Sequence, residues 1–164
     1  MKITFGGKEV TLIGTALKVG DPLPEFTLTN TELGHFSSKD LKLPAIVLTY
    51  PSVDTGPCSL ALLTFNDRLE DLNYNVYGIS CDLPFALDRW VKSNAGDYIT
   101  MLSDYKKHDF GEASGTLINE FRILARAVFI FDENGICQYT EYVPEVGDEP
   151  NYDQIMDEAK KYFA

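Results

Sequence analysis

Three nearly continuous apolar runs of strand length stand out along the chain, at residues 45–50, 76–80 and 127–131. Apolar runs without polar alternation are typical of strands that are buried on both faces of a sheet. A weaker run at residues 99–102 predicts a further strand at the edge of the same sheet. A sheet of this kind needs other elements to cover both of its faces.

Helical spacing of apolar residues appears after the first two runs and again at the end of the chain. The first set stands at i, i+3, i+7 and i+10 and predicts a helix through Leu62, Phe65, Leu69 and Leu72. A second helix is predicted over residues 84–92. A third is predicted in the closing segment, where one helical face collects Tyr152, Ile155, Met156, Ala159, Tyr162 and Phe163.

Two antiparallel hairpins are predicted outside this strand–helix alternation. Residues 3–5 and 10–13 flank a Gly-Gly pair and predict an N-terminal β-hairpin. Residues 127–131 and 138–143 flank a turn that ends in Asn-Gly, the strongest short hairpin signal. Together the elements run β-α-β-α-β and then β-β-α.

This order predicts an α/β fold of thioredoxin-like type, with a mixed sheet, helices on both faces and an N-terminal β-hairpin. The chain has 164 residues, enough to bury a sizeable core, and no Pro/Gly/Ser linker divides it. We therefore expect a single domain over residues 1–164.

The charge balance excludes nucleic acid as an expected partner. The chain has 25 Asp and Glu against 14 Lys and Arg, a net charge of −11, and no cluster of basic residues. It has neither an apolar run of about 18 residues nor an apolar signal segment near its start. We expect no membrane association and a cytoplasmic protein.

Three cysteines, Cys58, Cys81 and Cys137, narrow the chemistry further. An odd and sparse set without a secretory signal does not predict a disulfide framework. No two of the cysteines are close in sequence, and the only histidines are His35 and His108. A zinc site needs about four convergent nitrogen or sulfur ligands, so no metal site is expected. The open question is whether one of the thiols reacts.

Cys58 stands where a buried strand gives way to a helix. Gly56 and Pro57 suit a helix start, because proline at the first helical position loses no useful N–H. In the first turn the sulfur faces unpaired N–H groups and the positive end of the helix dipole, which favour thiolate over thiol. Thr55, three residues earlier, is placed to cap the helix or to reach the sulfur. A buried, unreactive thiol is the alternative interpretation.

The same residues resemble the active-site pattern of the peroxiredoxins, Pro51-x-x-x-Thr55-x-x-Cys58. The longer form, Pro-Ser-Val-Asp-Thr-Gly-x-Cys, is similar to that of the thiol peroxidase branch of this superfamily. Further stretches resemble that branch in the expected order, at residues 19–26, 79–86, 124–127 and 149–152. The resemblance covers essentially the whole chain.

The resemblance implies a peroxidase that uses no metal or organic cofactor. It implies that Cys58 attacks the terminal oxygen of hydrogen peroxide or an organic hydroperoxide and becomes a sulfenic acid. Arg126 would hold the thiolate and the peroxide oxygens, Thr55 would donate or relay a hydrogen bond to them, and Pro51 would shield the pocket from water. From its residue context alone, Arg126 also suits a surface ion pair. Thioredoxin or another small thiol is the implied reductant, and a homodimer the implied assembly.

The sequence departs from this branch at the resolving cysteine. That thiol normally ends a Pro-Phe-Ala-x-x-Arg-Phe/Trp-Cys stretch, and Val91 stands in its place here. Cys81 is the nearest substitute, because it follows a strand predicted to lie beside the one before Cys58, although a disulfide needs Cα atoms within about 7 Å. A buried core thiol at a strand end is the other interpretation of Cys81. Cys137, at the start of a hairpin strand, is expected to be structural.

Three outcomes follow for the oxidised protein. In the favoured one, an external thiol reduces the Cys58 sulfenate directly. In the second, Cys81 resolves it within the chain. In the third, the protein is a peroxide sensor or redox adaptor that turns over slowly and passes oxidation to a partner thiol.

Overall fold

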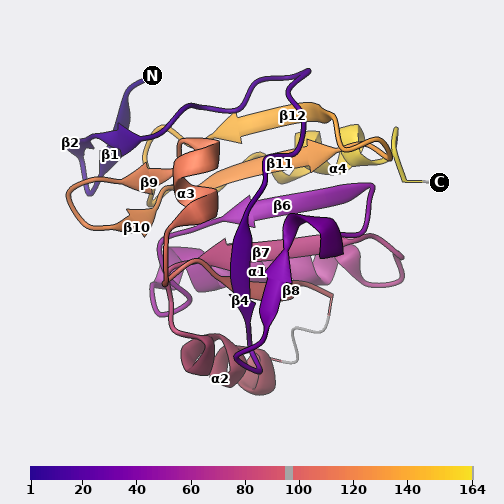
Figure 1. The fold of residues 1–164 in the computed structure, drawn as a ribbon, viewed down its shortest axis with the longest axis horizontal. Coiled ribbons are helices and arrows are strands. Elements are labelled where there is room, and N and C mark those ends of the chain that lie inside the picture. Colours follow the sequence, from indigo (N-terminus) through magenta and orange to yellow (C-terminus); the bar gives the residue numbers. More distant parts are fainter. Residues whose placement is uncertain (95–97, 164) are drawn as a thin grey trace.

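The computed structural model describes residues 1–94 and 98–163. Within them, seven strands form one mixed sheet: β4 (Thr27–Asn30), β5 (His35–Ser37), β6 (Ala45–Thr49), β7 (Val76–Ser80), β8 (Thr100–Ser103), β11 (Ala127–Phe131) and β12 (Cys137–Tyr142). Their order across the sheet is β12-β11-β6-β7-β8-β4-β5, and the first four strands follow one another from top to bottom in Figure 1. The three apolar runs are thus the neighbouring strands β11, β6 and β7, at the centre of the sheet.

The sheet is mixed because β6, β7 and β8 run parallel while the strands on either side run antiparallel to them. The prediction that residues 99–102 form an edge strand is wrong. β8 pairs with β7 on one side and with β4 on the other, and the β4–β5 hairpin forms the actual edge. β4 and β5 are short and partly polar, so the hydrophobic pattern does not reveal them.

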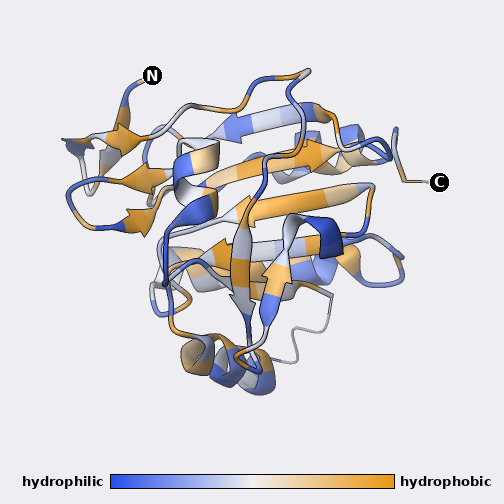
Figure 2. Cartoon of the chain, in the orientation of Figure 1, coloured by the Kyte–Doolittle hydropathy of each residue, from blue (hydrophilic) through white to orange (hydrophobic). Residues whose placement is uncertain are grey.

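Helices cover both faces of the sheet, as the sequence predicts. α1 (Gly56–Leu69), α2 (Pro84–Asn94) and α4 (Tyr152–Ala159) pack on one face, and α3 (Asp109–Ser114) packs on the other. Alternate residues of β6 point to opposite faces: Ile46 and Leu48 join the cluster under α1 and α4, and Val47 joins the one under α3. Figure 2 shows β6 and β11 as the hydrophobic middle of the molecule.

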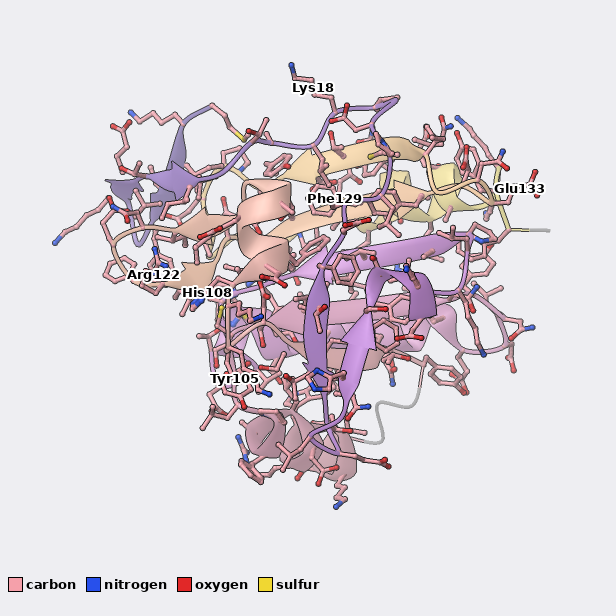
Figure 3. All side chains as sticks on the ribbon, viewed as in Figure 1. Lys18, Tyr105, His108, Arg122, Phe129 and Glu133 are labelled. Carbon is pink, nitrogen blue, oxygen red and sulfur yellow. The ribbon has the colours of Figure 1, made fainter. Side chains whose placement is uncertain are left out.

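An aromatic contact illustrates how α3 is held. Phe110 of α3 meets Phe129 of β11 edge to face, with ring centroids 6.0 Å apart, and Figure 3 labels Phe129 in this layer. Both rings are fully buried. The sequence does not predict α3, because six residues are too few to show helical periodicity.

The three predicted helices are present, with shorter ends at two of them. α1 stops at Leu69, because Glu70 leaves the helical conformation with ψ of 133° and Asp71 then adopts a left-handed backbone with φ of 67°, so Leu72 lies beyond the helix. α4 ends at Ala159, and Tyr162 and Phe163 follow it and still pack on the same core. No helix in residues 1–94 or 98–163 is long and apolar enough to cross a membrane.

The N-terminal hairpin is present as β1 (Ile3–Phe5) and β2 (Lys8–Val10). Gly6 and Gly7 have φ of 60° and 80°, which suits a two-residue hairpin turn and brings Phe5 opposite Lys8. The predicted second strand, residues 10–13, is divided between two elements, since Val10 ends β2. Residues 12 and 13 form β3 (Leu12–Ile13), which joins a separate sheet with β9 (Leu117–Ile118) and β10 (Ile123–Leu124). The second predicted hairpin is β11–β12, with a register shift near its turn.

Candidate active site

Cys58 lies in the first turn of α1, at the end of the loop that follows β6. Thr55 is the residue that caps the helix: its Oγ1 accepts a hydrogen bond from the Cys58 backbone N–H at 3.2 Å. Proline occupies the opening turn, as the sequence predicts. The Cys58 side chain is 1% exposed, so its sulfur is shielded from bulk water.

Arg126 reaches the same sulfur from the start of β11, the strand that pairs with β6. It directly precedes β11, whose first residue Ala127 pairs with Thr49 at the end of β6. This antiparallel register brings Arg126 to the point where α1 begins, and its Nη2 donates to Cys58 Sγ at 3.0 Å. Its Nε donates to the Val146 carbonyl, also at 3.0 Å. This contact favours the site interpretation of Arg126 over a surface ion pair, since the side chain is buried and, among residues 1–94 and 98–163, pairs with no carboxylate.

The electrostatics of this arrangement favour negative charge at the sulfur. A buried guanidinium attracts an anion much more strongly than an exposed one, because little water screens the charge. The N-terminus of α1 adds partial positive charge, and no acidic residue in its first turn offsets it. A thiolate and a developing oxygen anion are both stabilised by such donors.

Thr55 and Pro51 occupy the loop between β6 and α1. The Thr55 hydroxyl donates to the Ser52 carbonyl at 3.3 Å while it accepts from the Cys58 N–H. In this state its proton is directed to the loop, so a hydrogen bond from Thr55 to a peroxide oxygen requires the hydroxyl to rotate. Pro51 is buried, which is compatible with the shielding role that the resemblance implies.

Asp82 organises this loop, and the sequence alone does not mark it as a site residue. It follows β7, and its carboxylate accepts hydrogen bonds from Ser52 Oγ at 2.6 Å and from the Val53 N–H at 2.9 Å. The Ser80 hydroxyl donates to the same carboxylate at 2.7 Å, and the Ser103 hydroxyl donates to the Asp82 carbonyl. Three adjacent elements, the loop between β6 and α1, β7 and β8, therefore meet at Asp82.

We predict that Asp82→Ala slows oxidation of Cys58 by about 10-fold, because the loop that carries Thr55 loses its fixed geometry. It also leaves the buried Val53 N–H unpaired, which costs about 1–3 kcal/mol of folding free energy. Stopped-flow oxidation and urea unfolding measure the two effects. Asp88→Ala is the matched control, since the Asp88 carboxylate forms an exposed ion pair with Lys92 on α2. An Asp82→Ala protein that oxidises at the parental rate would contradict the prediction.

Two contacts join α2 to the start of α1. Arg89 forms an exposed ion pair with Asp54 in the loop between β6 and α1, at 2.6 Å. Trp90, the only tryptophan of the chain, is buried and donates from Nε1 to Ser59 Oγ at 3.1 Å. Val91, the residue at the usual resolving position, is partly buried against the same core cluster as Cys58.

The structure does not bring Cys81 to Cys58. Cys58 belongs to the core cluster under α1, whereas Cys81 packs against the cluster on the opposite face of the sheet. Burial and the nearby carboxylates of Asp104 and Asp82 raise the pKa of Cys81 to about 12, although Arg122, labelled in Figure 3, acts in the opposite direction. A thiol with this pKa attacks a sulfenic acid poorly at neutral pH.

Cys137 is buried at the start of β12, where its Sγ donates to the Tyr139 carbonyl at 3.4 Å. Burial raises its pKa to about 11. All three cysteines are free thiols in the structure. Across the described residues, no group of three or more His, Cys, Asp or Glu side chains is placed to hold a metal ion.

Comparison with known proteins agrees with this geometry. The AhpC/TSA family matches residues 19–140. A thiol peroxidase of Bacillus subtilis (strain 168) is 45% identical over 161 residues, covering 97% of this chain and 96% of the relative. A thiol peroxidase of Clostridium acetobutylicum is 43% identical over 161 residues, covering 98% of each.

Solved structures give the same result for the fold. The crystal structure of a peroxiredoxin-like protein from Aquifex aeolicus superposes with a TM-score of 0.92 at 35% identity, covering 98% of this chain and 96% of that one. A thiol peroxidase from Chromobacterium violaceum, at 24% identity, has a TM-score of 0.88 and the same coverage. The chain belongs to the AhpC/TSA family, and within it to the thiol peroxidase branch of the peroxiredoxins.

Proposed function

We propose that the protein reduces hydrogen peroxide and organic hydroperoxides at Cys58, and that an external thiol restores the enzyme. The observation that carries the proposal is the 3.0 Å hydrogen bond from the buried Arg126 guanidinium to the Cys58 sulfur. A cation held against a thiol in a site shielded from water is the requirement for a nucleophilic cysteine. The relatives named above are thiol peroxidases and support the same reaction.

The first step forms a sulfur–oxygen bond and breaks the peroxide bond. The Cys58 thiolate attacks the terminal oxygen of ROOH, the O–O bond breaks, and the RO fragment takes up a proton and leaves as an alcohol or water. Negative charge develops on the departing oxygen. The fixed Arg126 guanidinium and the positive end of the α1 dipole stabilise it there without reorganising. Thr55 supplies a further hydrogen bond when its hydroxyl rotates, and Pro51 keeps water from the sulfur.

The second step uses thiols from outside the chain. One thiol condenses with the sulfenic acid, releasing water and leaving a mixed disulfide on Cys58, and a second thiol releases Cys58 as a disulfide of the two reductants. The structure supports an external route because Cys81 lies on the opposite face of the sheet, Cys137 is buried, and position 91 is valine. We propose thioredoxin or a small thiol as the reductant.

The remaining features of the proposal follow from the family and the composition. We propose a single domain over residues 1–164, a homodimer in the cytoplasm, and a reaction that needs no metal or organic cofactor. The net charge of −11 argues against nucleic acid as a partner.

The test is to treat the reduced protein with one equivalent of hydrogen peroxide and to measure its intact mass. We expect the gain of one oxygen on Cys58, converted by added thiol to a mixed disulfide and then to the reduced protein. Loss of two hydrogens that disappears in Cys81→Ser would instead show resolution within the chain. An unmodified Cys58 would contradict the peroxidase function. Repeated turnover with thioredoxin separates the enzyme from a peroxide sensor, in which reaction stalls after one turnover.

A further inference from the structure

The β1–β2 hairpin lies outside the central sheet but packs next to the residues that flank Arg126. Its buried side chains Ile3 and Val10 form a cluster with Ile118, Ala125 and Val146. Ala125 precedes Arg126 in the chain, and Val146 is the residue whose carbonyl accepts the Arg126 Nε–H at 3.0 Å. The hairpin therefore contacts both the backbone that carries Arg126 and the backbone that receives its hydrogen bond.

Backbone hydrogen bonds fix the Val146 segment against β1. The Thr4 N–H donates to the Pro144 carbonyl at 2.7 Å, and the Val146 N–H donates to the Thr4 carbonyl at 2.9 Å. Thr4 and Glu145 thus form a parallel bridge. Because these bonds hold the chain on both sides of Glu145, they restrict where the Val146 carbonyl points.

The Glu145 carboxylate strengthens the same connection. It accepts from the Gly7 N–H in the hairpin turn at 2.6 Å and from the Thr4 hydroxyl at 3.1 Å. Its other oxygen accepts from the Gly147 N–H at 2.8 Å. The backbone N–H groups of Gly147 and Gly7 lower the pKa of Glu145, so the carboxylate is charged at neutral pH and its hydrogen bonds are charge-assisted.

We propose that the β1–β2 hairpin is a positioning element of the peroxidase site, which acts through Glu145 and the Val146 carbonyl to aim Arg126 at Cys58. The guanidinium is planar and its N–H directions are fixed, so the Nε hydrogen bond determines where Nη2 points. A shift of the Val146 carbonyl moves Nη2 relative to the Cys58 sulfur. The proposal rests on the proposed function of Cys58 and Arg126.

The experiment compares two glutamates, the half-buried Glu145 and the exposed Glu120, whose carboxylates both accept hydrogen bonds from backbone N–H groups. Glu145→Ala removes the carboxylate that joins the hairpin to the Val146 segment. Glu120→Ala is the matched control, because the Glu120 carboxylate accepts from the Thr11 N–H at 2.9 Å and 3.2 Å, outside the 144–147 segment. The measurement is the rate of a single oxidation of Cys58 by hydrogen peroxide, followed by Trp90 fluorescence and confirmed by the mass of quenched samples.

We expect Glu145→Ala to oxidise about 10-fold more slowly than the parent, and Glu120→Ala to change by less than about 2-fold. In an Arg126→Lys background, Glu145→Ala should cause no further loss of rate, because the planar guanidinium that Glu145 helps to position is absent. A merely structural role would give additive losses in that background. Should Glu145→Ala fail to fold, Thr4→Val removes one hydrogen bond to Glu145 and keeps the backbone pairing.

Each remaining result bears on the proposal. Equal rates for Glu145→Ala and the parent, equal slowing in both glutamate variants, or additive losses with Arg126→Lys would overturn the positioning role. Failure of the parent protein to oxidise at Cys58 would contradict the proposed function instead. The two failures are therefore distinguishable.

Discussion

Cys58→Ser abolishes hydroperoxide turnover, with an expected loss of more than about 1,000-fold. A serine hydroxyl keeps the size and the hydrogen bonds of the site, but it is not oxidised by peroxide as a thiolate is. The fold should be preserved, because the side chain stays small and Arg126 Nη2 can donate to the serine oxygen. Peroxide consumption in the presence of thioredoxin and its reductase measures the loss.

The other two thiols provide the controls. Cys137→Ser and Cys81→Ser should both retain at least about half of the parental rate, since neither thiol contacts the site in the described part of the chain. Any loss of stability in Cys137→Ser is separated from activity by assaying below the melting temperature. A Cys81→Ser protein that forms sulfenic acid but no longer turns over would sink the external route and assign the resolving role to Cys81.

Arg126→Met is expected to slow Cys58 oxidation by about 100- to 1,000-fold, because it removes the donor that stabilises charge on the sulfur and on the leaving oxygen. Arg126→Lys keeps the charge but loses the planar fork that bonds Val146 and Cys58 together, so an intermediate loss is expected. Stopped-flow rates over a range of peroxide concentrations give the second-order constants for all three proteins.

Thermal unfolding distinguishes this loss from a damaged fold. The contacts described for the Arg126 guanidinium are a carbonyl and the sulfur, so burying its charge is costly to stability. Methionine fills similar space without that cost. The substitution also leaves the buried Val146 carbonyl without its donor, which costs about 1–3 kcal/mol, so the two effects offset each other and Arg126→Met should melt close to the parent. If it melts well below the parent, its low activity reflects a loosened core and the assignment of Arg126 fails.

The sequence predicts the central part of the fold because that part is long and apolar. β6, β7 and β11 are each buried at every position, and α1 shows helical spacing over much of its length. β5, β9 and α3 are shorter than a readable strand or helix pattern, or partly polar, so they carry no period that distinguishes them from loops. The edge position assigned to β8 was wrong for this reason, since its outer neighbour was not seen.

The candidate site shows the same division. The helix-start context and the family pattern were sufficient to select Cys58 and Arg126, but their contact depends on the antiparallel register of β11 and β6. Because Cys81 follows β7, the sequence predicts that it lies at the same end of the parallel strands as Cys58. It does not predict which face of the sheet the Cys81 side chain packs against. Successive side chains along a strand point to opposite faces, so a single residue decides which core a thiol joins.

The contacts that join α2 to the loop before α1 and to the first turn of α1 bear on how long the oxidised state of Cys58 lasts. With Trp90 bonded to Ser59, Arg89 paired with Asp54, and no thiol on α2, the proposed cycle forms no intrachain disulfide that would pull this helix away from the site. The sulfenic acid then persists until a thiol arrives from outside. Under this mechanism the oxidised fraction of the protein follows the ratio of peroxide to thiol in its surroundings.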